Sequence, residues 1–215
     1  GAEGKRVVAV VGDLEREKLG VSAPDLARMK GKVAHVFHLA AVVSAAAEAD
    51  FDLGMRVNVE GTRAVLEACR ALPKAARLVF ISSIAVFGGD MPPTLIDTTP
   101  LTPQTSYGAQ KAIGELLLSD YSRRSFFDGV GLRLPTICVR PGLPNKAAST
   151  WASSVLREPL TGVDVVCPVT PETIMVVLSP RKTVDAFMRL HDLPPDAFGP
   201  GRTLLLNGIN VTARE

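Results

Sequence analysis

The chain has 215 residues, 47% of them hydrophobic and 21% charged, so it is long enough to bury a substantial core. Its formal net charge of +2 is spread along the sequence without clusters of lysine and arginine, which argues against a nucleic-acid partner. No apolar run approaches the roughly 20 residues that span a bilayer, so we expect no membrane partner either.

The cysteine and histidine residues do not predict a metal site. Cys69, Cys138 and Cys167 lie far apart and show neither a metal-ligand spacing nor an even-numbered disulfide framework. His35 and His38 share an expected strand, with no third ligand to suggest zinc, and we expect them to be structural. We therefore predict no bound metal, reduced thiols and a cytoplasmic protein.

Four short apolar runs predict strands. Each run is nearly continuous rather than strictly alternating, which is what a strand covered on both faces requires. In chain order the predicted strands lie at residues 5–13, 32–41, 76–83 and 130–137.

Helical patterns separate these runs, at about residues 24–31, 51–72 and 107–124. In the last of them, Ala112, Ile113 and Leu116 are expected to hold the helix against the sheet. Strands that alternate with helices indicate an α/β fold, a Rossmann-like doubly wound parallel sheet.

The pattern changes after about residue 138, where proline and glycine become frequent. A helix near 149–158, a strand near 163–167 and a helix near 180–192 are expected, the last opened by Ser179 as its cap. We predict that residues 1–140 form the Rossmann-like domain, incomplete at its N-terminus, and that residues 141–215 form a small, incomplete substrate lobe.

Candidate site residues follow each predicted strand. Ligands of parallel α/β sheets bind beyond the carboxyl ends of the strands, so these residues are expected to line one crevice. In chain order they are Gly12, Asp13 and Leu14, then Leu39, Ala40 and Ala41, then Ser82 and Ser83, and finally Pro135 and Thr136.

Tyr107 and Lys111 lie one helical turn apart and project from the same face. An ammonium close to a phenol lowers the pKa of the phenol, so Tyr107 is expected to exchange a proton with an alcohol or carbonyl oxygen. Ser83 would hold the same oxygen by a hydrogen bond. Proton transfer is half of a carbonyl/alcohol redox reaction, and the hydride of the other half must come from a nicotinamide.

Five motifs in chain order resemble the extended short-chain dehydrogenase/reductases, a family that includes sugar-nucleotide epimerases and dehydratases. The motifs are HLAA (38–41), NVEGT (58–62), SSIAVFG (82–88), YGAQK (107–111) and LRLPTICVRPG (132–142). Within that family, the sequence of residues 35–160 is similar to the sequences of D-erythronate dehydrogenases, which oxidise a four-carbon sugar acid with NAD.

The resemblance implies a role for each site residue. Tyr107 would be the catalytic acid/base, Lys111 would tune it and bind the nicotinamide ribose, and Ser83 would orient the reacting oxygen. Because a sugar-acid carboxylate needs a cation or amide donors, our candidates for binding it are Asn145, Lys146 and Arg181, while Ser83 would contact the substrate at its reacting oxygen. The implied cofactor contacts are Asp13, Leu14, Leu39, Ala40, Ala41, Asn58, Ser82, Tyr107, Lys111, Pro135 and Thr136.

Two departures from the family pattern leave alternatives open. The chain begins at what would be the third strand of such a fold, without the Gly-rich turn and acidic residue that bind the cofactor, so we expect a fragment of a longer chain. NAD and NADP both remain candidate cofactors, and a homodimer remains a candidate assembly. Residues 5–41 also resemble thioester and fatty-acyl reductases. An epimerase or dehydratase, a thioester reductase and a non-catalytic dinucleotide-fold protein therefore remain alternatives to a sugar-acid dehydrogenase.

Overall fold

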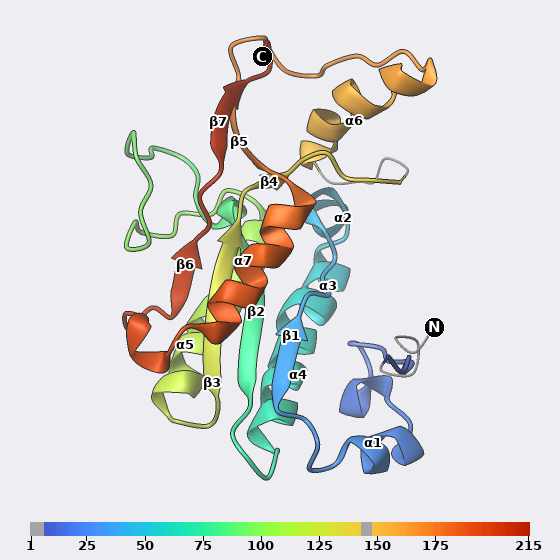
Figure 1. The fold of residues 1–215 in the computed structure, drawn as a ribbon, viewed down its shortest axis with the longest axis vertical. Helices are drawn as coiled ribbons and strands as arrows, with labels where there is room; N and C mark the ends of the chain where they lie inside the picture. Colours follow the sequence, from blue (N-terminus) through green and yellow to red (C-terminus); the bar gives the residue numbers. More distant parts are fainter. Residues whose placement is uncertain (1–6, 143–147) are drawn as a thin grey trace.

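The main sheet of the protein has four parallel strands. The computed structural model describes residues 7–142 and 148–215. Within them the strands pair in the order β1-β2-β3-β6, each parallel to its neighbour (Figure 1). Their bounds are β1 (His35–His38), β2 (Arg77–Ser83), β3 (Asp128–Leu134) and β6 (Thr203–Leu205). The predicted Rossmann-like parallel sheet is confirmed.

Three long helices cover the two faces of this sheet. α4 (Thr62–Arg70) and α5 (Ser106–Arg123) lie behind it in Figure 1, whereas α7 (Pro180–Asp192) crosses its front. The predicted cap of α7 is confirmed, because the Ser179 side chain accepts a hydrogen bond from the backbone N–H of Lys182. The sheet is thus covered on both faces, as predicted from its continuous apolar runs.

Strand β2 contributes to both hydrophobic layers. Its residues Leu78 and Phe80 pack with α4 and α5, whereas Val79 packs on the other face with Leu190 of α7. All three side chains of β2 are fully buried, and burial of such a side chain contributes about 1.5–3 kcal/mol. The core therefore holds the amino-terminal half of β2 between two layers of helices.

The remaining helical segments are short. Residues 51–70 form one continuous run, in which α3 (Phe51–Gly54) and a π-helical turn, η3 (Met55–Gly61), precede α4. In the described part of the chain, no helix is both long and apolar enough to cross a bilayer. The others are η2 (Glu17–Gly20), α1 (Ala23–Met29), α2 (Ser44–Ala49), η4 (Ile84–Val86), η5 (Ala148–Thr150), α6 (Trp151–Arg157), η6 (Pro159–Thr161) and η7 (Pro195–Ala197).

A second, smaller sheet lies at the carboxyl end of the main one (Figure 1). Its strands are β4 (Thr136–Ile137), β5 (Ile174–Leu178) and β7 (Ile209–Thr212), in the order β4-β5-β7. Residues after 140 contribute both to this sheet and to the main sheet, through β6 and α7. The division into domains at residue 140 stays a prediction.

Two predicted strands are wrong. Residues 7–13 and 163–167 form no strand, although their composition favours one. Val7 and Val11 are 80% and 87% exposed, and neither segment pairs with a strand among the described residues. An apolar run becomes a strand only when a neighbouring strand accepts its hydrogen bonds, and residues 7–142 and 148–215 offer neither segment such a neighbour.

The expected orientation of α5 is also wrong in part. Leu116 is 68% exposed and Ile113 is exposed as well, so neither holds the helix against the sheet. Ala112 is buried as predicted, and Glu115 and Leu118 complete the buried face with it, at the spacing of three to four residues that one face of a helix requires.

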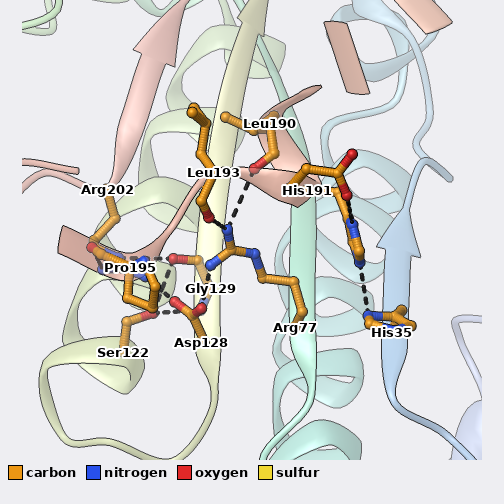
Figure 2. Close-up of polar contacts among 11 residues, drawn as sticks. His35, Arg77, Ser122, Asp128, Gly129, Leu190, His191, Leu193, Pro195 and Arg202 are labelled. Atoms are coloured by element: carbon orange, nitrogen blue, oxygen red, sulfur yellow. Dashed lines mark hydrogen bonds and ion pairs between the residues drawn. The ribbon is translucent and has the colours of Figure 1, made fainter. Parts of the chain in front are cut away.

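A polar cluster ties the amino ends of β2 and β3 to α7, at the end of the sheet opposite the candidate site. Asp128 begins β3 and forms ion pairs with both Arg77 and Arg202 (Figure 2). Arg77 also donates to the backbone carbonyls of Leu190 and Leu193. Because Arg77 and Asp128 are direct partners in the sheet, this cluster fixes the register of the two strands.

We predict that Gly114→Ala destabilises the protein, although alanine favours helices over glycine by about 1 kcal/mol. A Cβ at Gly114 would lie 2.6 Å from Cζ of Phe80, whose ring is fully buried in the hydrophobic core. We expect the free energy of unfolding to fall by about 1–3 kcal/mol in urea titrations.

Two variants control this prediction. Phe80→Leu should reduce the further loss that Gly114→Ala causes, because it shortens the obstructing side chain. Gly199→Ala, where no heavy atom lies within 4 Å of the added Cβ, should leave stability nearly unchanged. A Gly114→Ala protein as stable as the parent would contradict the close packing of α5 on β2.

Candidate active site

Helix α5 brings Tyr107 and Lys111 to the carboxyl end of β2. Thr105 caps the helix, since its side chain accepts a hydrogen bond from the backbone N–H of Gly108. A Cβ at Gly108 would stand 2.0 Å from the carbonyl oxygen of Ala85. Glycine at this position therefore allows the first turn of α5 to approach the segment that follows β2.

Lys111 is buried beside this strand end. The residue is 4% exposed, and its Nζ donates a hydrogen bond to the backbone carbonyl of Ile81 at 2.8 Å. Nζ also lies 5.7 Å from the ring centroid of Tyr107. Burial lowers the pKa of the Lys111 ammonium to about 8, and the nearby Glu115 carboxylate opposes that change. Lys111 therefore titrates within the range in which enzymes work.

The pKa of Tyr107 corrects an expectation from the sequence. Burial raises the pKa of the phenol, while a hydrogen bond between the side chains of Tyr107 and Ser83 opposes the rise. The expected net lowering is wrong because loss of hydration on burial outweighs the effect of the hydrogen bond with Ser83. Ser83 also accepts a hydrogen bond from the backbone N–H of Ala85, at 3.1 Å. The hydroxyl and the phenol thus meet at the end of β2.

Asn58 lies in the π-helical turn η3 and fixes a neighbouring loop. Its Oδ1 accepts from the backbone N–H of Val42 at 2.8 Å, and its Nδ2 donates to the carbonyl of Val42 at 2.9 Å. Nδ2 also donates to Oε1 of Gln110 on α5, at 2.7 Å. Asn58 therefore links the loop after β1 to the helix that carries Tyr107. π-helical turns often mark functional sites.

A cavity of about 550 Å³ opens at the carboxyl end of β1. Four of the predicted cofactor residues line it, namely Asp13, Leu14, Ala40 and Ala41. Its other lining residues are Val11, Gly12, Arg16, Gly20, Val42 and Val57.

The cavity suits part of a dinucleotide. Its volume lies in the range of small-molecule sites, and apolar walls with one carboxylate can hold a ring and its ribose. Asp13 is half exposed, pairs with Arg16, and accepts a hydrogen bond from the backbone N–H of Glu15. The residues present therefore fit a nicotinamide dinucleotide on the side that they cover.

The remaining predicted cofactor residues lie at the carboxyl ends of β1, β2 and β3, and they differ in their exposure to solvent. Leu39 is exposed directly after β1. Pro135 and Thr136 are buried where β3 passes into β4. The Ser82 side chain is buried and donates to Glu115, so its hydroxyl points into the protein.

The predicted substrate residues lie on two segments. Arg181 is exposed in the first turn of α7. Asn145 and Lys146 lie outside the described residues.

Sequence reasoning missed two buried polar residues of the site, Glu115 and Arg133, and expected a third, His38, to be structural. His38 lies 2.9 Å from the Thr62 hydroxyl, and burial, with a smaller effect of Lys111, lowers its pKa to about 4. Glu115 and Arg133 form a buried ion pair. For Glu115 the sequence held a signal, because it lies one helical turn beyond Lys111. For Arg133, in an apolar strand, it held none.

Comparison with known proteins identifies the family. Residues 2–163 match the family described as male sterility protein, an NAD-binding family. This match covers more than half of the chain. The protein belongs to the extended short-chain dehydrogenase/reductases.

Named relatives and solved structures agree with this assignment. D-erythronate dehydrogenase from Cupriavidus necator is 54% identical over 213 residues, which are 99% of this chain and 64% of that protein. D-erythronate dehydrogenase from Haemophilus influenzae is 49% identical over 180 residues, 84% of this chain and 57% of that protein. The crystal structure titled nucleoside-diphosphate-sugar epimerase from Agrobacterium tumefaciens gives a TM-score of 0.85 at 46% identity, covering 95% of this chain and 59% of that chain. The chain thus spans less than two thirds of the length of each.

We predict that His38 makes the protein sensitive to acid. Its pKa is about 4 in the folded protein, against 6.5 for an unperturbed histidine, so the unfolded chain binds more protons between these values. The free energy of unfolding should therefore be fully retained above pH 6.5 and fall by about 3 kcal/mol as the pH drops to 4. Urea titrations at a series of pH values measure this slope.

Two histidine variants test the assignment. His38→Gln should flatten the slope between pH 6.5 and 4, whereas His191→Gln, at the end of α7, should leave it in place. An unchanged slope in His38→Gln would show that another group is responsible.

Proposed function

We propose that the protein is an NAD-dependent oxidoreductase that oxidises a secondary hydroxyl of a small sugar acid such as D-erythronate. The observation that carries this proposal is the meeting of Ser83, Tyr107 and Lys111 at the carboxyl end of β2, next to the cavity after β1. The similarity to two proteins named D-erythronate dehydrogenase supports the choice of substrate.

Each of the three residues has a defined task in this reaction. Oxidation of a secondary alcohol removes a proton from oxygen and a hydride from carbon, and bound NAD would accept the hydride. Tyr107 would take the proton, and Ser83 would hold the substrate oxygen within reach of the phenol. Because burial raises the pKa of Tyr107, its phenolate needs a nearby positive charge. The Lys111 ammonium supplies that charge.

The cofactor would occupy the edge of the sheet from β1 to β3. Asp13, Leu14, Ala40 and Ala41 would bind it through the cavity that they line. Asn58 would act through the loop that it holds at Val42. The further contacts in this proposal are Leu39, Ser82, Tyr107, Lys111, Pro135 and Thr136. NADP stays an alternative.

The substrate side of the proposal rests on the second half of the chain. Residues 1–140 would bind the cofactor and residues 141–215 the substrate. Arg181, Asn145 and Lys146 would bind the carboxylate of the sugar acid, because a carboxylate needs a cation or amide donors. A reaction that draws on NAD fits a cytoplasmic protein, and a homodimer stays a prediction.

We predict that Tyr107→Phe in the full-length protein lowers kcat for D-erythronate oxidation by at least about 100-fold, because it removes the proton acceptor. NAD binding should persist, since the ring remains. Tyr121→Phe is a matched control, because the chain has two tyrosines and both lie on α5. Tyr121 bonds to Glu67 at the far end of the helix, so its variant should keep its turnover. Equal turnover in the parent and Tyr107→Phe would refute the assignment.

A second candidate is a sugar-nucleotide epimerase, which the 46% identity to a structure titled as one favours. The two activities differ in their products, because an epimerase returns its nicotinamide oxidised. We predict net NADH, measured as absorbance at 340 nm, in proportion to the sugar acid consumed. Turnover of a sugar nucleotide without net NADH would support the epimerase instead.

A further inference from the structure

A buried polar cluster lies directly behind the candidate catalytic residues. We name it the Glu115 cluster, after the residue at its centre, and it comprises Ser82 of β2, Glu115 of α5, Arg133 of β3 and Asp97. Glu115 is 4% exposed and Arg133 is 6% exposed. Oε2 of Glu115 accepts from Nη2 of Arg133 at 2.8 Å, and Oε1 accepts from Nε of Arg133 at 3.1 Å.

The cluster links three elements of the site. Ser82 and Arg133 are direct partners in the sheet, and both donate to Glu115. Arg133 also donates to the backbone carbonyl of Asp97, at 2.9 Å. Glu115 thus fastens α5 to the ends of β2 and β3. The adjacent residue on β2 is Ser83, so the position of its hydroxyl depends on this contact.

Stability alone does not account for such a pair. Desolvation of two buried charges offsets much of their attraction, and well-packed apolar residues often serve as well or better. A buried ion pair therefore suggests a function for its charge. Lys111 lies on the same helix, one turn before Glu115, and its pKa responds to that carboxylate.

Among the described titratable groups around Lys111, Glu115 is the one that stabilises its charged form. Tyr107 precedes it on α5, His38 approaches from β1, and Arg133 approaches from β3 through the Glu115 cluster. His38 is neutral above pH 6, given its pKa of about 4. Within the part of the chain that the structure describes, Glu115 is the one carboxylate that raises the pKa of Lys111.

Other carboxylates near α5 are directed elsewhere. Glu48 of α2 accepts a hydrogen bond from the backbone N–H of Ser106, at the start of the helix. Glu67 of α4 bonds to Tyr121, towards its end. The support for the Lys111 charge therefore comes from the Glu115 cluster.

We propose that Glu115 is a positioning residue for the Ser83, Tyr107 and Lys111 site: its carboxylate supports the positive charge of Lys111 and fixes the strand end that carries Ser83. This inference rests on the proposed function for its catalytic meaning. Its physical claim, that the carboxylate keeps Lys111 charged to higher pH, stands apart from any particular substrate.

Glu115→Gln tests the physical claim directly. The substitution preserves shape and removes the charge, so the pKa of Lys111 should fall by about one unit. Competitive amine labelling over a pH series, read by mass spectrometry at Lys111, measures this pKa in the 215-residue chain without turnover. Because the variant leaves the Arg133 charge uncompensated, Glu115→Gln with Arg133→Met supplies a second form, in which the pKa should also lie below that of the parent.

Asp128→Asn is the matched control. Asp128 also forms ion pairs with two arginines, Arg77 of β2 and Arg202 just before β6, but at the amino end of β3 (Figure 2). It should lower stability and leave the pKa of Lys111 unchanged. The proposal is overturned if Lys111 keeps its pKa in a folded Glu115 variant, or if Asp128→Asn shifts that pKa equally.

Turnover separates this inference from the proposed function. In the full-length protein, the alkaline limb of the kcat/KM profile for D-erythronate should move to lower pH in Glu115→Gln by the same amount as the pKa of Lys111. An unmoved limb, in a variant whose Lys111 pKa has fallen, would refute the catalytic meaning. A parent protein without turnover, combined with a shifted Lys111 pKa, would refute the proposed function and leave the electrostatic role of Glu115 supported.

Discussion

The close packing of α5 on β2 is the contact on which the site depends. Gly114 leaves room for the ring of Phe80, and Gly108 lets the first turn of the helix touch the segment after the strand. With the helix this near, the Lys111 side chain reaches the backbone carbonyl of Ile81. The same approach strips Lys111 of water, which lowers its pKa. Packing and active-site charge therefore have a common origin.

The parts of the fold that follow from local pattern could be predicted from the sequence. β1, β2 and β3 were found because strands covered on both faces leave near-continuous apolar runs, and α7 because Ser179 caps it. Pairing could not be predicted in the same way. Residues 163–167 have the composition of a strand but pair with no strand in the part of the chain that the structure describes, whereas β5, β6 and β7 are short strands defined by partners distant in sequence.

The residues of the candidate site also fall into two groups, those that a local sequence pattern predicts and those that only strand pairing brings together. Tyr107 and Lys111 lie about one helical turn apart on α5, so the sequence alone predicts that they are close together. Arg133 meets Ser82 only through the register of β2 and β3, which no local pattern contains. The pKa of Tyr107 was expected to fall because its ionic neighbour is visible in the sequence, whereas its burial is not. Burial of the phenol therefore determines that the pKa of Tyr107 rises rather than falls.

The two walls of the cavity after β1 are held with unequal strength. On one side, Asn58 binds both backbone groups of Val42 and so anchors that wall to the helix layer. On the other side, residues 11–20 are mostly exposed, and they are held by turns, by an exposed ion pair between Glu15 and Arg56, and by Leu14 and Leu19, which pack against the hydrophobic core. Exposed ion pairs contribute about 1 kcal/mol or less. The wall formed by residues 11–20 therefore rests on two apolar side chains and on contacts that water can reach, whereas the opposite wall is fixed by hydrogen bonds to the buried side chain of Asn58.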